Sequence, residues 1–226
     1  MTIEEDAKSR GITRLCHFTE SRNLAYMHAG FEAILPTAAL LKTYRALFNP
    51  TDRQRFDGHV DKISCSIEYP NVWYFEKARA NQPIFPDWVV LLIEPSQLWA
   101  PTTVFSPCNA SRDSGAHVGS SDAAFKGLFA SEVFTGQTRR AKHLPCSPTD
   151  DQAEVLVCGP VLLSSLLGVG VFDEAQARRE FARLKQLGYD PTRFRWIIAP
   201  HFFQKYQLSG AIRRGERPVE KPWSSR

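Results

Sequence analysis

Glu154 is the residue best placed for chemistry, because it stands where the polar run 148–153 (PTDDQA) passes into the apolar run 155–157 (VLV). A carboxylate at the start of a buried strand can be held rigidly at the rim of a pocket, since a regular element positions a side chain more accurately than a loop does. Such a carboxylate can stabilise positive charge on a substrate or accept a proton from it. On this stretch alone, an ordinary surface carboxylate at a strand end is the simpler interpretation.

Several other polar side chains lie beside apolar stretches and are candidates for the same site. They are His17, Arg55, Ser64 or Ser66, and Tyr74. Each has a structural explanation of its own: a buried histidine can bond a backbone carbonyl, an arginine can pair with a nearby aspartate, and a tyrosine can belong to the core. Their occurrence together with Glu154 is harder to explain by structure alone, and it indicates a polar site built against a sheet.

The sequence lacks the common catalytic and cofactor motifs. It holds no phosphate-binding P-loop and no serine nucleophile elbow, and Gly168 and Gly170 do not extend to a dinucleotide fingerprint. Cys16 and His17 have the side chains of a nucleophile and a base, but neighbours on a strand point to opposite faces and would not meet. The histidines lack the spacing of metal ligands, so we predict no metal site.

The composition indicates one large domain without a disulfide framework. The 226 residues are 43% hydrophobic and 12% aromatic, enough to bury a full core. The five cysteines are odd in number and widely separated, which is typical of reduced, mostly buried thiols in a cytoplasmic protein. The N-terminus MTIEEDAKSR is charged, and no apolar run approaches the ~20 residues of a membrane span, so we expect neither a signal peptide nor a membrane partner.

The net charge of +4 is concentrated at the C-terminal end. Residues 201–226 contain six basic and two acidic side chains, which accounts for the whole excess. A basic end can form a phosphate-contacting surface, and it can equally be a solvated, partly disordered tail. We therefore divide the chain into a domain over residues 1–200 and a basic C-terminal tail over residues 201–226.

Apolar periodicity predicts both strands and helices. The predicted strands cover residues 12–18, 63–67, 88–93, 155–157 and 195–199, and the predicted helices cover residues 22–29, 37–48, 72–80, 122–133 and 173–187. Residues 51–62 are expected to form an ordered loop or a short helical turn, and residues 101–121 a functional or mobile loop. Strand and helix do not alternate regularly, which favours a mixed α+β domain over a doubly wound sheet.

Four segments resemble, in order, the DarT family of ADP-ribosyltransferase toxins. They are LCHFTESRNL (15–24), NPTDRQRFDGHVDKISCSIEYPNVWYF (49–75), FPDWVVLLI (85–93) and PTDDQAEVLV (148–157). Members of this family use NAD to attach ADP-ribose to bases of single-stranded DNA. The resemblance spans residues 12–171 and implies a single-domain ADP-ribosyltransferase-like fold, with mixed central β-sheets flanked by helices, and NAD as a substrate. It also implies a toxin–antitoxin pair, in which a DarG-like macrodomain antitoxin removes the modification.

The resemblance also implies a role for each candidate residue. Glu154 in QAEVLV is similar to the catalytic glutamate shared across ADP-ribosyltransferases. Arg55 in DRQRFDGH resembles the family's essential arginine, near the NAD phosphates and the reacting ribose, with Arg53 as the alternative. His17 in the HFT motif is expected to hydrogen-bond the ribose next to nicotinamide.

Three more residues are expected to contact NAD, namely Thr19 of the HFT motif, Ser64 and Tyr74. The ring of Tyr74, or of its neighbour Trp73, is suited to stacking on nicotinamide or on a target base.

The acceptor base is inferred from one departure from the family pattern. Residues 63–67 read ISCSI, where thymidine-modifying members carry an aromatic run followed by Arg-Ser, which suggests the subgroup that modifies guanine. A target base must leave its stack to react, so a single strand is the natural substrate. We expect its contacts on the loop 100–121 and on Arg139, Arg140 and Lys142.

Two alternatives remain open. The NAD chemistry can act on RNA or protein instead of DNA. The chain can also be a non-catalytic domain that binds single-stranded nucleic acid through aromatic rings and its basic end. This second alternative predicts that removing Glu154 leaves function intact.

Overall fold

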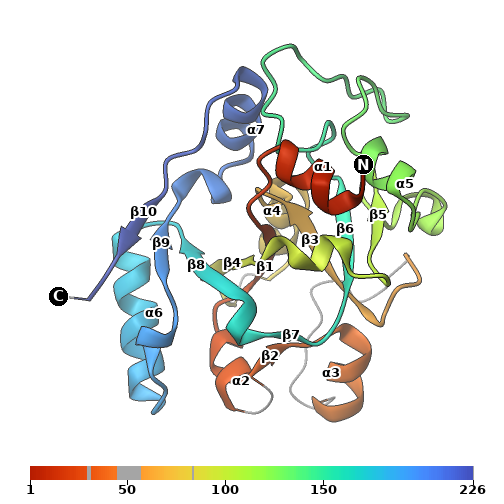
Figure 1. Ribbon diagram of the computed structural model, residues 1–226. Helices are drawn as coiled ribbons and strands as arrows, with labels where there is room; N and C mark the ends of the chain where they lie inside the picture. Colours follow the sequence, from red (N-terminus) through yellow and green to blue (C-terminus); the bar gives the residue numbers. More distant parts are fainter. Residues whose placement is uncertain (30–31, 45–56, 83, 226) are drawn as a thin grey trace.

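The computed structural model describes residues 1–29, 32–44, 57–82 and 84–225. These residues form a mixed α+β domain in which helices flank one large sheet (Figure 1). The helices are α1 (Ile3–Ser9), α2 (Asn23–Ala29), α3 (Thr37–Tyr44), α4 (Val72–Ala80), α5 (Asp122–Gly127), α6 (Glu174–Gln186) and α7 (Lys205–Arg214). The strands are β1 (Leu15–Glu20), β2 (Ala33–Ile34), β3 (Lys62–Ile67), β4 (Trp88–Ile93), β5 (Val104–Ser106), β6 (Glu154–Cys158), β7 (Val161–Leu162), β8 (Leu166–Val171), β9 (Trp196–Ile198) and β10 (Lys221–Trp223).

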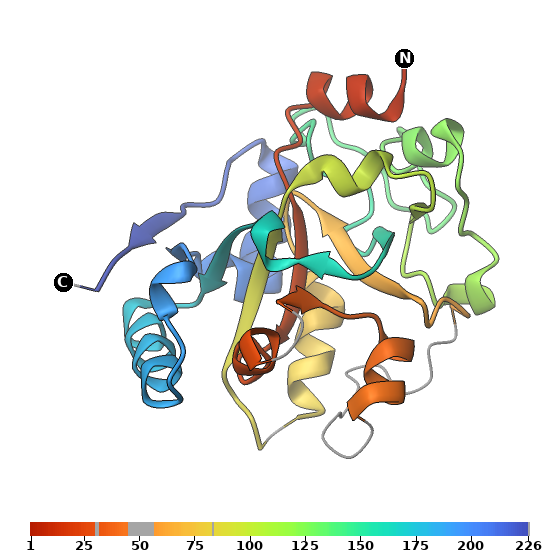
Figure 2. The ribbon, with the colours of Figure 1, turned by 60° about the horizontal axis from the view of Figure 1, so that its bottom comes forward.

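The large sheet has the strand order β10-β9-β8-β4-β1-β3-β6-β5. β8 and β9 are parallel, and the other neighbouring strands are antiparallel. This mixed order confirms the predicted α+β class, because a doubly wound sheet would be mostly parallel. β2 and β7 form a separate two-stranded sheet, which lies with α2 and α3 at the lower end of the molecule (Figures 1 and 2).

β1 and β3 diverge in the middle of the sheet. Among the described residues they pair only at Leu15↔Ile67 and Cys16↔Ser66, whereas β1 pairs with β4 along its whole length. On its other side, β3 pairs with β6 over residues 62–65. Beyond Cys16, the facing backbone edges of β1 and β3 no longer form a ladder, so a side chain can bond to the exposed peptide groups there.

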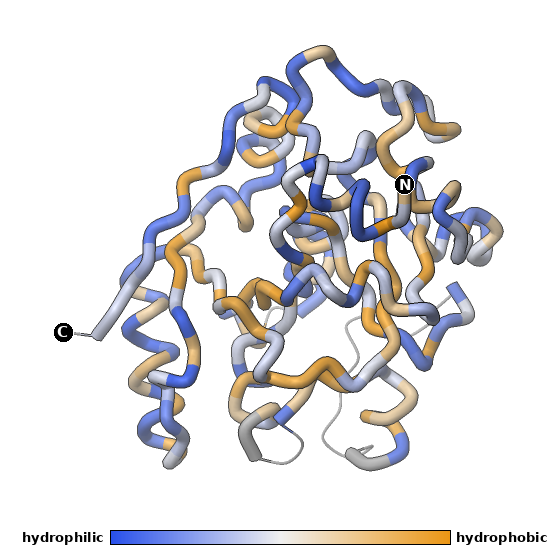
Figure 3. Tube along the Cα trace, in the orientation of Figure 1, coloured by the Kyte–Doolittle hydropathy of each residue, from blue (hydrophilic) through white to orange (hydrophobic). Residues whose placement is uncertain are grey.

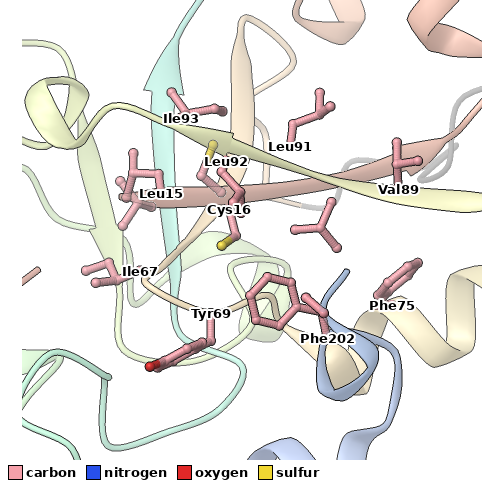
Figure 4. Packing of buried hydrophobic residues seen from close by; sticks show 14 of the residues in the cluster. Leu15, Cys16, Ile67, Tyr69, Phe75, Val89, Leu91, Leu92, Ile93 and Phe202 are labelled. Atoms are coloured by element: carbon pink, nitrogen blue, oxygen red, sulfur yellow. The ribbon is translucent and has the colours of Figure 1, made fainter. Parts of the chain in front are cut away.

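β4 lies at the centre of the core, and all six of its residues are buried, as its apolar sequence WVVLLI predicts. Its side chains pack with Leu15, Phe75 and Phe202 in one cluster (Figure 4). Hydrophobic residues lie along the strands, both in the middle of the molecule and in β2 and β7 at its lower end (Figure 3). Close packing of this kind holds the strands that carry the candidate site in fixed positions.

Local sequence explains most of the helix boundaries. α4 has the predicted bounds, and α6 follows Asp173, whose side chain accepts a hydrogen bond from the Gln176 N–H as a helix cap. The helix predicted over residues 122–133 is shorter than expected. α5 ends at Gly127, because the chain turns there and places the Phe129 ring edge-on against Phe125.

Three strands of the large sheet were not predicted, namely β5, β8 and β10, the last of which lies in the predicted tail. β8 contains glycines, which are uncommon in strands, but a Cβ at Gly168 would lie 2.8 Å from the Arg195 carbonyl oxygen, so the close approach of β9 requires glycine. β5 lies within the predicted loop 101–121 and is only three residues long, too short for a visible periodicity. Its last residue, Ser106, pairs with Glu154.

The predicted basic tail, residues 201–226, is part of the domain, which corrects the division at residue 200. α7 buries Leu208, Ala211 and Ile212, and β10 pairs with β9 at the edge of the sheet. Phe202 belongs to the core cluster. The three buried apolar positions of α7 have helical spacing, but the charged and polar residues around them concealed this short apolar face in the sequence.

All five cysteines are free, and four of them are buried, as predicted. Burial raises the pKa of the Cys16 thiol to about 12, so this side chain is protonated at neutral pH. The thiol donates to the Glu68 carbonyl oxygen over 3.3 Å. Cys16 is therefore a core residue and not a nucleophile activated by its neighbour His17.

Candidate active site

Glu154 occupies the first position of β6, and both of its carboxylate oxygens accept hydrogen bonds. Ser64 Oγ donates to Oε2 and Asn109 Nδ2 donates to Oε1, each over 2.9 Å. Ser64 lies opposite Leu156, so Ser64 and Glu154 are diagonal neighbours on one face of the β3–β6 pair. Glu154 is 8% exposed. A carboxylate bonded at both oxygens is fixed in one orientation, which suits a catalytic group.

Asn109 is the site residue that the sequence analysis missed. Its Oδ1 accepts hydrogen bonds from the Ser111 N–H over 3.1 Å and from the Ser111 Oγ over 2.5 Å, so its amide nitrogen must face Glu154. Asn-x-Ser turns are common in loops. The turn itself could have been predicted, but its partner depends on how the unpredicted strand β5 pairs with β6.

His17 lies on β1, at the point where this strand diverges from β3. Its Nδ1 is 2.8 Å from the Ser64 carbonyl oxygen, which can only accept, so Nδ1 carries the proton. The imidazole thus bonds to the β3 backbone beyond the last ladder pair. Since the Ser64 hydroxyl bonds Glu154, one residue joins His17 to the carboxylate. The structure therefore brings together three of the predicted residues.

Thr19 follows on the same face of β1. It is buried, and its Oγ1 accepts a hydrogen bond from Asn23 Nδ2 over 2.7 Å, next to the start of α2.

The two aromatic candidates on α4 have different surroundings. The Tyr74 ring contacts Phe18, with centroids 6.1 Å apart, and Phe18 points to the opposite face of β1 from His17. The Trp73 Nε1–H is shared between Asp151 Oδ2 and Ser209 Oγ, each 3.2 Å away. Trp73 thereby ties α4 to α7 and to the segment before Glu154. This position does not fit the alternative stacking role that we considered for Trp73.

Asp150 and Asp151 hold the acidic segment before Glu154 in place through contacts with other parts of the chain. Thr135 Oγ1 donates to Asp150 Oδ2 over 2.7 Å, and Arg213 forms an ion pair with Asp151 over 2.6 Å. The two aspartates thus fix the loop, and the third acidic residue, Glu154, is the one that bonds Ser64. A buried, paired support of this kind keeps the Glu154 carboxylate in place.

Arg139 has a structural role, and its contact with DNA stays a prediction. Its guanidinium donates to the carbonyl oxygens of Ser147 over 2.9 Å and of Leu144 over 2.8 Å. Because both terminal nitrogens bond the backbone, the guanidinium holds the loop 144–147. Arg140 and Lys142 are exposed, and their contact with DNA stays a prediction.

His143 in the same loop is expected to make stability depend on pH. It is 5% exposed, and burial, with Arg139 and Arg213 nearby, lowers the pKa of its imidazole to about 4, although Asp151 opposes the shift. A histidine in the unfolded chain has a pKa of about 6.5. As the pH falls through the range between these values, only the unfolded chain takes up a proton, so stability is lost.

We expect wild type to lose on the order of 1 kcal/mol of unfolding free energy through this group between pH 7 and pH 5. His143→Leu should lose correspondingly less over the same range. Urea unfolding at both pH values measures the difference, and an equal pH dependence in the two proteins would contradict the assignment to His143.

The predicted Arg55 and its alternative Arg53 lie outside the described residues. The buried Asp57 is the first described residue after them, and its carbonyl oxygen is 2.9 Å from the place of a Cβ on Gly115. Within the described parts of the chain, no group of three His, Cys, Asp or Glu side chains is placed to hold a metal. The helices described are also too short or too polar to cross a membrane.

Comparisons with known proteins give one consistent match. A family model described as "ssDNA thymidine ADP-ribosyltransferase, DarT" matches residues 16–204. The structure of Thermus sp. 2.9 DarT in complex with NAD+ aligns with a TM-score of 0.53 and 14% identity, over 84% of this chain and 97% of that chain. The same Thermus protein in complex with ADP-ribosylated ssDNA gives a TM-score of 0.54 and 12% identity, over 85% and 97%.

A longer protein also matches. The structure of Thermosipho africanus DarTG in complex with ADP-ribose aligns with a TM-score of 0.54 and 12% identity, over 84% of this chain and 51% of that chain. Comparison with curated protein sequences gave no match. At these identities the solved structures establish the fold, and they confirm the ADP-ribosyltransferase-like architecture predicted from the sequence.

Proposed function

Because this chain belongs to the DarT family of single-stranded DNA ADP-ribosyltransferases, we propose that it transfers ADP-ribose from NAD to a base of single-stranded DNA, as the toxin of a toxin–antitoxin pair. The observation that carries the proposal is the Glu154 carboxylate, bonded at both oxygens and joined to His17 through Ser64. Complexes of the Thermus protein with NAD+ and with ADP-ribosylated ssDNA support the same substrates here.

The proposed reaction breaks the bond between the nicotinamide nitrogen and the adjacent ribose carbon. The bonding electrons leave with nicotinamide, and positive charge develops on the ribose, as in glycoside cleavage. Glu154 stabilises this charge, and its orientation by Ser64 and Asn109 means that no reorganisation is needed during the reaction. A nitrogen of the DNA base then bonds to the ribose carbon and loses its proton, which Glu154 accepts.

The other predicted residues are proposed to position NAD. Since His17 Nδ1 donates to the Ser64 carbonyl oxygen, Nε2 is the nitrogen that can accept a hydrogen bond from a ribose hydroxyl. Thr19, on the same face of β1, is proposed to contact the same nucleotide. Arg55 is proposed to bind the pyrophosphate through its bidentate fork, which a lysine could not reproduce. Tyr74 contacts Phe18, on the face of β1 opposite His17, so of its two expected roles stacking on a target base fits this position better than stacking on nicotinamide.

Asn109→Ala is expected to reduce kcat of ADP-ribose transfer about 10- to 100-fold, because a hydrogen bond to an ionised group contributes roughly 1.5–3 kcal/mol. Asn109→Asp should be less active still, since a second carboxylate would face Glu154. The KM for NAD should change less than kcat, because Asn109 orients Glu154 and is not proposed to bind NAD. Steady-state kinetics of the two variants measure both quantities, and a change confined to KM would contradict this role.

Guanine is the proposed acceptor base. β3 carries Ser64, Cys65 and Ser66, where thymidine-modifying members carry an aromatic run followed by Arg-Ser. Two single-stranded oligonucleotides test the proposal, one with a single guanine and one with a single thymine in an otherwise identical strand of adenine and cytosine. Incubation with NAD followed by mass analysis should show modification of the guanine strand. Modification of the thymine strand alone would contradict the choice of base and agree with the description of the family model.

The partner is proposed to be a DarG-like macrodomain antitoxin that removes the modification. The complex of Thermosipho africanus DarTG with ADP-ribose supports such a pairing. Induced expression of the wild-type chain should stop bacterial growth, and co-expression of a DarG macrodomain should restore it. Growth arrest that persists with the macrodomain present would argue against a reversible DNA modification.

A further inference from the structure

An exposed ring stack lies on the two loops that flank α5. The His117 imidazole and the Phe134 ring are stacked, with centroids 3.8 Å apart and 23° between their planes. Phe134 is nevertheless 53% exposed. The Arg112 guanidinium lies 5.9 Å from the centroid of the Phe134 ring. We call His117, Phe134 and Arg112 the ring platform.

Polar contacts, and not a hydrophobic cluster, hold the platform in place. His117 Nε2 bonds Asp113 Oδ2 over 2.8 Å, which fixes the orientation of the imidazole. Asp113 and Ser114 have φ values of 49° and 56°, a left-handed conformation that turns the chain sharply before His117. On the second loop, Thr135 bonds Asp150 over 2.7 Å. An exposed phenylalanine held in this way has no role in the core.

Each of the two loops that carry the ring platform is connected to the site around Glu154. The Arg112 N–H bonds the carbonyl oxygen of Asn109 over 3.0 Å, and the Asn109 side chain bonds Glu154. From the second loop, the Thr135 contact reaches Asp150, four residues before Glu154. A molecule bound at Glu154 that extends along either loop would therefore meet the platform.

We propose that the ring platform stacks on a base of the single-stranded DNA that neighbours the modified base. This inference rests on the proposed function and extends it to a second contact with the substrate. The exposed ring gives a flat surface for a base, and Arg112, which forms no ion pair with any residue that the structure describes, supplies positive charge for an adjacent phosphate. Since every base has a flat face, the platform sets the position of the strand without selecting its sequence.

Abasic sites test the proposal. Oligonucleotides with one target base receive an abasic site at each neighbouring position in turn, and fluorescence anisotropy measures their Kd for the protein. For wild type, one position should weaken binding about 5- to 100-fold when its base is removed. For Phe134→Ala, the Kd for the intact strand should rise by a similar factor above the wild-type value. An abasic site at the same position should then raise the Kd of this variant no further. Phe134→Trp should bind the intact strand as tightly as wild type does, and its binding should weaken when the base at that position is removed.

Phe172→Ala is the matched control, because Phe172 is an exposed ring that follows β8, on the other half of the sheet. Its Kd values should match those of wild type. An abasic effect of equal size in wild type and Phe134→Ala would overturn the proposal. A raised KM for NAD in Phe134→Ala, with unchanged DNA affinity, would also overturn it and assign the platform to adenine of NAD. Failure of wild type to bind or modify any DNA would instead contradict the proposed function.

Discussion

Glu154→Gln is expected to reduce ADP-ribose transfer by about 10²- to 10³-fold, the loss typical when a group that stabilises developing charge is removed. The amide keeps the size of the side chain but has no negative charge to stabilise the positive charge that develops on the ribose. It also disturbs the local bonds, because Ser64 and Asn109 both donate, and an amide oxygen replaces only one of the two carboxylate oxygens. Steady-state rates with NAD and single-stranded DNA measure the loss.

The melting temperature of Glu154→Gln distinguishes a catalytic role from a structural one. We expect it to stay close to the wild-type value, since the surrounding loop is held by Asp150 and Asp151 and not by Glu154. Glu174→Gln is the control for activity, because Glu174 is exposed and pairs with Arg178 on α6. Full activity in Glu154→Gln would contradict the mechanism and favour a domain that only binds nucleic acid.

Glu220→Ala is expected to destabilise the protein by about 3–5 kcal/mol, because it leaves a buried cation without its partner. Arg14 Nη1 and Nη2 each donate to a different Glu220 oxygen over 2.6 Å, and Arg14 Nε donates to the Glu68 carbonyl oxygen over 2.8 Å. Burial alone would lower the pKa of the Arg14 guanidinium, but the hydrogen bonds to Glu220 raise it overall. The pair links the C-terminal segment to Arg14, the residue directly before β1.

Thermal melting measures this effect, and for a chain of this size we expect the melting temperature to fall by roughly 10 °C. Glu216→Ala is the control within the same segment, because Glu216 is exposed and pairs with the exposed Arg214. It should melt at the wild-type temperature. Equal melting of wild type and Glu220→Ala would mean that the segment is not docked, and would favour the solvated tail that was one of the two alternatives left open by the sequence.

Elements with a clear local pattern could be predicted from the sequence. β4 is a continuous apolar run, and α4 and α6 have capping residues that fix where they begin. The C-terminal segment could not be placed, since charged residues interrupt its apolar positions and its partners, such as Arg14, are far away in the sequence. β8 was missed because its glycines are explained only by the contact with β9.

Individual residues of the candidate site could be predicted from the sequence, but their arrangement in space could not. His17, Ser64 and Glu154 stand on β1, β3 and β6, which become neighbours only through the strand order of the sheet. The contacts of Asn109 and Arg139 could not be predicted from the sequence either. An ordinary loop asparagine bonds the central carboxylate, whereas an arginine in a basic run bonds the backbone. In both cases the role depends on contacts between distant segments.

Intact mass analysis of single-stranded DNA, duplex DNA and RNA oligonucleotides, after incubation with the purified protein and NAD, tests the proposed reaction most directly. We expect a mass gain of one ADP-ribose on single-stranded DNA, and no gain when Glu154→Gln replaces wild type under the same conditions. No gain on single-stranded DNA with wild type, or an equal gain with Glu154→Gln, would contradict it.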